Sequence, residues 1–195
     1  MGRTVLSQGT TMDPKSDERY MTMALESAVR AGQKGEVPVG AVLVKGDEVL
    51  ASDHNRCVEL CDPTAHAEIL VLRKAGKVLE NYRLNNTVLY VTAEPCPMCV
   101  SAMVYGRISR LVFGAPEPKF GAVRSKFKLL ESEGFNHRIE VKQGVLEKDC
   151  VEALQVFFRK RRGRKASPEC VVGSSENRRK NRGWKIEDRR LGEEF

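Results

Sequence analysis

The stretch Thr87–Cys99 reads TVLYVTAEPCPMC. Its first part, Thr87–Thr92, is a run of apolar and β-branched residues that is typical of a buried strand. A proline directly after Cys96 favours the start of a helix, which we predict for Pro97–Tyr105. A Cys-x-x-Cys pair at a helix start puts both sulfurs on one side of the helix, where they can bind one ion. The stretch therefore predicts a strand, a tight connection and a helix that carries two metal ligands.

Strands and helices alternate on both sides of this stretch. The predicted helices cover 17–32, 65–79, 126–133 and 148–162, and the second of them has Asp62 or Thr64 as its N-cap candidate. The predicted strands cover 39–44, 48–52, 87–92, 109–114 and 137–141, and the first two form a hairpin through Gly46-Asp47. A loop is expected from His54 to Asp62. This order predicts an α/β fold in which helices cover both faces of a mixed sheet.

The ends of the chain differ in composition from the middle. At 195 residues and 41% hydrophobic, the chain can bury one good core. We expect a disordered leader over 1–16, one domain over 17–162, and a basic, disordered tail over 163–195. No apolar run suits a signal peptide or a membrane span, which predicts a soluble cytoplasmic protein.

A second motif lies upstream, in the stretch TAHAEI at 64–69. His66 and Glu68 are two residues apart, and side chains at that spacing do not share a face of a regular helix. The spacing makes sense if the helix only begins at His66, because the imidazole can then bind a metal while the longer carboxylate reaches a water on it. We therefore predict His66 as a ligand and Glu68 as the catalytic residue.

One imidazole and two thiolates form a ligand set for a catalytic zinc that keeps its fourth position open. His66, Cys96 and Cys99 are the predicted ligands. Zinc lowers the pKa of a bound water to about 7. Glu68 can then act as base and afterwards as acid toward a leaving ammonia. The pattern His-x-Glu followed by Pro-Cys-x-x-Cys is the established signature of zinc nucleobase deaminases.

Plainer interpretations exist for each half of this pattern. A lone Cys-x-x-Cys is more often a structural zinc site, a redox pair or a coincidence, and a structural site would need a fourth ligand, for which Cys57 and Cys61 are candidates. A structural zinc does not need a nearby proton carrier, so Glu68 favours the catalytic interpretation. We expect free thiols at Cys57, Cys61, Cys150 and Cys170, and structural or loop roles for His54 and His137.

The charge of the chain is compatible with a polyanionic partner. The net charge is +7, and the segment Arg159–Lys165 is almost wholly basic where it follows the last apolar periodic segment. We expect this segment to emerge beside the site and contact nucleic-acid phosphates. A solvated helix end is the alternative.

A longer set of motifs resembles the bacterial tRNA-specific adenosine deaminases. The resemblance covers about Asp17 to Arg162, and it lies in Glu36–Val44, Asn55-Arg56, Asp62–Glu68, Glu80–Leu84, Leu89–Thr92, Glu94–Cys99, Arg110–Gly114, Asn136–Arg138 and Phe157–Arg159. The metal motif alone is common to all zinc deaminases, so the flanking motifs carry the more specific resemblance.

The resemblance implies a fold and an activity. The fold would be a cytidine-deaminase-like three-layer α/β/α sandwich with a mixed five-stranded sheet. The enzyme would be a homodimer with one zinc ion per subunit. It would convert the wobble adenosine (position 34) of an arginine tRNA to inosine by hydrolytic deamination.

The resemblance also implies roles for particular residues. Asn55 would hydrogen-bond the target nucleoside, and the backbone at Ala67 would meet the adenine edge. The nucleotide pocket would be lined by Pro38, Val39 and Phe158. Glu117 stands where the family commonly has aspartate, in a loop that would contact a flanking nucleotide. The cations expected at the tRNA backbone are Lys119, Arg159, Arg161 and Arg162.

Two other functions fit part of the pattern. A free nucleoside or base deaminase, of the guanine or cytosine type, would use the same zinc site without needing a basic last helix. A binding module would use a structural zinc only to hold a nucleic-acid surface. Activity on an anticodon loop distinguishes the first of these from a tRNA enzyme, and Glu68 argues against the second.

Overall fold

The sheet at the centre of the molecule has five strands in the order β2-β1-β3-β4-β5. The structure, a computed structural model, describes residues 14–163. The strands are β1 (Gly40–Lys45), β2 (Glu48–His54), β3 (Thr87–Ala93), β4 (Arg110–Ala115) and β5 (Glu140–Gln143). The first two form the predicted hairpin, in which Gly46 adopts a left-handed φ of 58° in the turn.

The pairing of the strands decides which ends meet. β1 runs antiparallel to β2 and β3, whereas β3, β4 and β5 are mutually parallel neighbours. The carboxyl ends of β3, β4 and β5 therefore lie at one edge of the sheet, together with the amino end of β1. In open α/β sheets, ligands bind outside the carboxyl ends of the strands. We call this edge the site edge.

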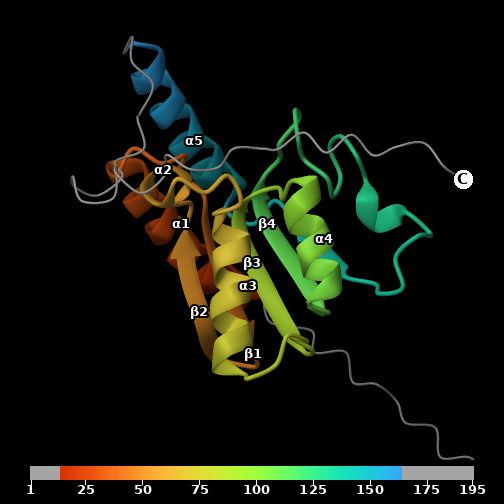
Figure 1. Cartoon of the computed structure of the whole chain (residues 1–195). Coiled ribbons are helices and arrows are strands. Elements are labelled where there is room, and N and C mark those ends of the chain that lie inside the picture. Colours follow the sequence, from red (N-terminus) through yellow and green to blue (C-terminus); the bar gives the residue numbers. More distant parts are fainter. Residues whose placement is uncertain (1–13, 164–195) are drawn as a thin grey trace, which may run out of the picture.

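Helices cover both faces of the sheet, as Figure 1 shows. On one face lie α3 (Ala67–Val78) and α4 (Pro97–Tyr105), whose apolar residues join a core cluster with Leu43, Leu89 and Leu111. On the other face lie α1 (Pro14–Gln33) and α5 (Glu147–Arg162), which share a second cluster with Tyr90 and Val112. The predicted three-layer α/β/α sandwich with a mixed five-stranded sheet is confirmed.

Gly40 explains how closely α1 approaches the sheet. A Cβ atom at this position would collide with the carbonyl oxygen of Ala24 and would lie 2.6 Å from the backbone nitrogen of Ala28. Only glycine leaves room for that contact. The first residue of β1 thus sets the distance between two layers, at the site edge.

The loop predicted over His54–Asp62 is partly wrong. His54 belongs to β2, and residues Cys57–Leu60 form a short helix, α2. The backbone N–H groups of Val58 and Glu59 donate to the Glu36 side chain at 2.9 and 2.8 Å. A carboxylate more than twenty residues away therefore caps this helix, and the sequence around Cys57–Leu60 contains no local pattern that predicts the cap.

The helix predicted over Lys126–Glu133 is also wrong. Only a 3-10 turn forms, η1 (Leu129–Glu131). The N–H groups of Lys126 and Phe127 donate to the carbonyl of Gly121 instead of to an α-helical ladder, and Lys128 has a left-handed φ of 48°. Strand β5 begins three residues later than the predicted start at 137, because its pairing with β4 starts at Arg110 opposite Glu140.

The boundaries of the domain differ slightly from those expected. α1 already begins at Pro14, inside the stretch predicted as a leader. The rest of that leader, and residues 164–195 of the tail predicted over 163–195, lie outside the described residues. Within 14–163, no helix has the length and apolar character needed to cross a membrane.

Candidate active site

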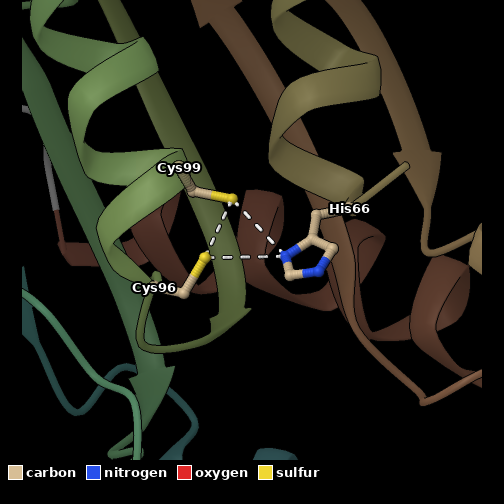
Figure 2. Close-up of side chains that lie close together, drawn as sticks. All are labelled: His66, Cys96 and Cys99. Atoms are coloured by element: carbon tan, nitrogen blue, oxygen red, sulfur yellow. Dashed lines mark hydrogen bonds between the residues drawn. The ribbon is translucent and has the colours of Figure 1, made fainter. Parts of the chain in front are cut away.

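Three predicted ligands meet at the site edge, as Figure 2 shows. The Nδ1 atom of His66 lies 3.7 Å from Sγ of Cys96 and 3.6 Å from Sγ of Cys99, and the two sulfurs are 3.7 Å apart. These residues form a group of potential metal ligands within the described chain. Neither Cys57 nor Cys61, the candidates for a fourth ligand, belongs to that group.

Two helix starts bring these side chains together. His66 is the N-cap residue of α3 and Cys96 is the N-cap residue of α4, and both have extended backbone conformations. Pro97 occupies the first turn of α4, where its missing N–H costs nothing. Both helices direct their positive N-terminal ends at the site, which favours thiolate over thiol.

The spacing of the three atoms fits a tetrahedral zinc ion. Zinc binds sulfur at about 2.3 Å and nitrogen at about 2.0–2.1 Å, so tetrahedral angles separate two sulfurs by about 3.8 Å and sulfur from nitrogen by about 3.6 Å. The three observed distances lie within about 0.1 Å of these values. One imidazole and two cysteines also leave one tetrahedral position for water, as catalytic zinc sites do.

The electrostatics of the three ligands also suit a cation. A hydrogen bond from Cys99, helped by His66 and opposed by burial, lowers the pKa of Cys96 to about 4. Cys96 is therefore a thiolate at neutral pH, which is the form that binds metal. The same contact with Cys96, together with burial, raises the pKa of Cys99, whose thiol therefore holds its proton more firmly than a free cysteine does. A metal ion would displace that proton.

Glu68 lies in the first turn of α3 and is buried, with 3% of its surface exposed. Burial raises the pKa of its carboxyl group. Glu68 interacts with Cys99, and its Oε2 atom has no hydrogen-bond partner among the described residues. A buried carboxylate oxygen without a partner is expected to bind a water or a ligand. Glu68 thus has the burial and the raised pKa of a general acid and base.

Asn55 connects β2 to the start of α3. Its Oδ1 atom accepts the N–H of Ala67 at 2.8 Å, and its own N–H donates to the carbonyl of Val39 at 3.0 Å. No described residue accepts a hydrogen bond from the side-chain amide nitrogen of Asn55. The three residues predicted to meet the nucleoside, Asn55, Ala67 and Val39, are therefore neighbours, and the Ala67 N–H is held by Asn55.

The two neighbouring phenylalanines of the last helix differ in their exposure. Phe157 is half-buried and lines a cavity of about 370 Å³ with the buried Pro38, between α1 and α5. Phe158 is 42% exposed, and its expected place in the nucleotide pocket stays a prediction. Arg159 and Arg162 are exposed, and Arg161 lies 5.9 Å from the centre of the Phe157 ring.

Residues 116–128 connect β4 to η1 beside the metal ligands. Glu117 is half-buried and Lys119 is exposed, and the Lys119 N–H donates to the Glu117 side chain at 2.9 Å. Four residues of this segment, at 117 and 123–125, donate hydrogen bonds to the side chain of Glu94, whose role the sequence analysis missed. Its only signal was an acidic residue between a buried strand and the motif Pro-Cys-x-x-Cys.

The remaining cysteines and histidines have structural surroundings. No disulfide joins the five cysteines of the described chain, and Cys150 is buried against β4. Cys170 lies outside the described residues. The His54 Nδ1 atom lies 2.8 Å from the Asn55 carbonyl oxygen, and His137 Nε2 lies 2.7 Å from that of Ile108. Neither histidine belongs to the ligand group.

Sequence comparison assigns residues 15–162 to the model of the MafB19-like deaminases. The tRNA-specific adenosine deaminase of Haemophilus influenzae is 46% identical over 159 residues, which are 81% of this chain and 92% of the relative. The tRNA-specific adenosine deaminase of Bacillus subtilis is 48% identical over 149 residues, which are 76% of this chain and 92% of the relative.

Solved structures show the same relationship. A chain from a study of A-to-I editing by tRNA:A34 deaminases at the wobble position matches with a TM-score of 0.69 and 45% identity, over 70% of this chain and 99% of that chain. A guanine deaminase from Nitrosomonas europaea matches with a TM-score of 0.62 over 80% of this chain and 98% of its own length. Its 23% identity shows a common fold alone.

Proposed function

This chain belongs to the MafB19-like deaminases and, among them, to the tRNA-specific adenosine deaminases, and we propose that it converts the wobble adenosine of an arginine tRNA to inosine. Water replaces the exocyclic amino group of the base, and ammonia leaves. Since the substrate is tRNA, the enzyme would act in the cytoplasm. The triangle of His66, Cys96 and Cys99 beside the buried Glu68 is the observation that carries the proposal.

In this proposal zinc is the resident metal, and when bound it supplies a Lewis acid that makes water nucleophilic near neutral pH. Glu68 accepts a proton from the attacking water and passes it to the leaving amino group. Burial raises the pKa of Glu68 above that of a free carboxylic acid, which makes its carboxylate a better base toward the attacking water. His66, Cys96 and Cys99 hold the metal.

Substrate binding falls to the residues around Asn55. The amide nitrogen of its side chain donates to the nucleoside, while its Oδ1 atom keeps the start of α3 in place through Ala67. Pro38 and Val39 shape the wall at the start of β1. The reacting base must leave the stack, at a cost of about a few kcal/mol that is lowest in a single-stranded loop. An anticodon loop therefore suits the site better than a duplex.

The test is direct conversion of RNA. We expect an arginine tRNA anticodon stem-loop with the anticodon ACG to be read as G at the wobble position after incubation, and the same adenosine held in a duplex to stay unchanged. A free guanine or cytidine assay runs in parallel. If the free base or nucleoside is converted while the stem-loop stays unchanged, the alternative of a small-molecule deaminase is supported and a tRNA substrate is contradicted.

We also propose that the enzyme is a homodimer. A largely apolar groove of about 580 Å³ runs between α3 and α4 and includes Leu72, Tyr82 and Tyr105. Tyr82 is 72% exposed and Tyr105 is 76% exposed, and Val78 nearby on α3 is 58% exposed. Exposed apolar surface of this kind marks protein interaction sites, and the family resemblance implies that a second copy of the chain covers it.

Light scattering after size exclusion tests the dimer. The wild-type protein is expected at twice the mass of one chain. Tyr105→Glu places a charge in the groove and is expected to shift the mass to that of one chain. A matched Glu on the opposite face, at the 51% exposed Val29 of α1, is expected to leave the mass unchanged. A monomeric wild-type protein would contradict the dimer.

A further inference from the structure

Glu94 is a buried carboxylate directly beside the metal-binding turn. It follows the last residue of β3, it is 4% exposed, and it stands two residues before the ligand Cys96. Its Oε1 atom accepts the backbone N–H groups of Val123, Arg124 and Ser125 at 3.0, 2.6 and 2.9 Å. One oxygen thus satisfies three consecutive amides in the segment that follows β4.

The second oxygen fixes the other end of the same segment. Glu94 Oε2 accepts the N–H of Glu117 at 3.1 Å and also the hydroxyl of Ser125 through a short hydrogen bond. The N–H of Ala122 donates at 2.8 Å to the carbonyl of Pro95, the residue just before Cys96. The segment Glu117–Ser125, which we call the anchored loop, is therefore tied to the metal-binding turn from both of its ends.

Gly121 shows how tightly the anchored loop closes around this carboxylate. A Cβ atom there would lie 2.5 Å from Glu94 Oε2 and would also collide with the carbonyl oxygen of Glu117. No larger residue fits without moving the loop or the carboxylate. The arrangement is specific to glycine at the loop and to a carboxylate at position 94, because a carboxylate accepts hydrogen bonds on both oxygens and donates none.

The outer side of the anchored loop has the chemistry of an RNA-binding surface. Lys119 and Arg124 are exposed there, and the Phe120 side chain is 65% exposed. Lys119 has no ion-pair partner among the described residues. Cations contact phosphates, and an exposed aromatic ring stacks on an unpaired base. Both features lie on a loop whose inner side contacts the turn that holds Cys96.

We propose that Glu94 is a positioning residue for RNA recognition, which holds the anchored loop so that Lys119 and Phe120 grip the nucleotides flanking the reacting adenosine. The inference rests on the proposed tRNA substrate. The five hydrogen bonds that the Glu94 carboxylate accepts all come from the anchored loop. Glu94 acts through the loop that it orders.

Glu94→Gln tests this directly. The glutamine NH₂ group would face amide donors instead of accepting from them, so part of the loop loses its anchor. Hydrogen exchange at the amides of Val123, Arg124 and Ser125 is expected to become at least about tenfold faster. The KM for the anticodon stem-loop should rise about tenfold, the scale of one lost stacking contact, while kcat and zinc content stay near wild type.

Two further variants keep the test decisive if Glu94→Gln does not fold. Gly121→Ala keeps the Glu94 side chain but displaces the loop. It should raise both the rate of hydrogen exchange at the loop amides and the KM for the stem-loop. Asp17→Asn removes another buried carboxylate, which lies in the first turn of α1 and is hydrogen-bonded to Arg110 and Lys142 and not to the loop. It should lower the melting temperature while leaving the loop amides and KM unchanged.

The position of Phe120 allows a stricter check. If Glu94 acts through the loop, Glu94→Gln and Phe120→Ala should not be additive, and the double variant should have about the KM of the worse single variant. Unchanged exchange and KM in Glu94→Gln would overturn the proposal. Loss of zinc and of kcat at constant KM would also overturn it, because Glu94 would then support the metal. A wild-type protein inactive on the stem-loop would contradict the proposed function instead, while the exchange data still report on the anchor.

Discussion

The backbone conformation of His66 allows His66 and Glu68 to serve one site although they are only two residues apart. As N-cap of α3, His66 has φ −71° and ψ 151°, so its side chain leaves the chain before the helical period applies, whereas Glu68 follows within the first turn. The sequence was sufficient to predict that these residues and the two cysteines lie together, because the motif places each of them at a helix start. It was not sufficient for the bond between Asn55 and Ala67 or for the anchor at Glu94, since both depend on partners that only the fold brings close.

Glu68→Gln separates the proton carrier from the ligands. The change keeps size and burial but removes the proton transfer, which is worth roughly a hundred- to ten-thousandfold in rate. We expect kcat on the stem-loop to fall by that factor while zinc content, measured by atomic absorption, stays near one per chain.

Cys99→Ala is the matched comparison. It removes a buried ligand without touching Glu68, so zinc content and activity should be lost together. Zinc loss in Glu68→Gln would mean that Glu68 is itself a ligand and that its assignment as acid and base is wrong.

At the scale of elements, α5 shows both what periodicity predicts and where it stops. The helix was predicted within one residue of its observed start and to its observed end at Arg162. The half-buried stripe runs through Ala153, Leu154 and Phe157, and Phe158 falls just beyond its border. Periodicity gives the stripe but not its edge, which depends on how far α1 covers the helix. Periodicity also fails for the helix predicted at 126–133. There the backbone N–H groups of Lys126 and Phe127 donate to the carbonyl of Gly121 instead of forming a helix.

The basic last turn of α5 should contribute to RNA binding through charge. Each phosphate neutralised by a cation steepens the fall of affinity with salt by about 0.7 to 0.9 log units per decade. Replacing Arg159, Arg161 and Arg162 with alanine is expected to weaken stem-loop binding and to flatten the salt slope by roughly two. Fluorescence anisotropy over a salt series measures both.

Lys45→Ala is the control, because Lys45 is an exposed cation at the end of the sheet opposite the site edge. It should leave the slope unchanged. If the triple variant also retains the wild-type slope, the last turn of α5 is only a solvated helix end and the RNA is held elsewhere.

At the scale of the whole molecule, Asp17 joins the first helix to three strands. It is fully buried, accepts two hydrogen bonds from Arg110 at 2.9 and 3.1 Å, and accepts others from Tyr90 at 2.8 Å and Lys142 at 2.7 Å. In the sequence, Asp17 resembled only an acidic residue in a first helical turn. Its real partners are 73, 93 and 125 residues away, so no local pattern could reveal this network.

Asp17→Asn should be strongly destabilising, because it leaves the cations of Arg110 and Lys142 without their charge partner. Breaking a buried ion pair from one side costs about 3–5 kcal/mol, which lowers the melting temperature of a domain of this size by roughly 10 °C or more. Calorimetry at neutral pH measures the shift. Glu131→Gln, which breaks the half-exposed pair with Arg124, should cost less than about 1 kcal/mol.

The contribution of Asp17 should depend on pH with a definite sign. Burial alone would raise the pKa of Asp17, but hydrogen bonds from Arg110, Lys142 and Tyr90 outweigh it and lower the pKa below its usual 3.8. A lowered folded-state pKa means stability that is present above 3.8 and is lost as the pH falls further. The difference in the free energy of unfolding between the wild-type protein and Asp17→Asn should therefore be constant near neutral pH and become smaller only below pH 3.8. A gap that already narrows near pH 6 would point to another titrating group.

The Asp17 network also sets an order of events on the ribosome. The first helix buries a carboxylate whose cations arrive with β4 and β5, and Lys142 is synthesised 125 residues after Asp17. At about 5–20 residues per second, this delay amounts to roughly 6–25 seconds of translation. During that time α1 has no complete partner for its charged end, and the nascent chain cannot close this face of the sheet. The layer that is made first is thus the one that the fold completes last.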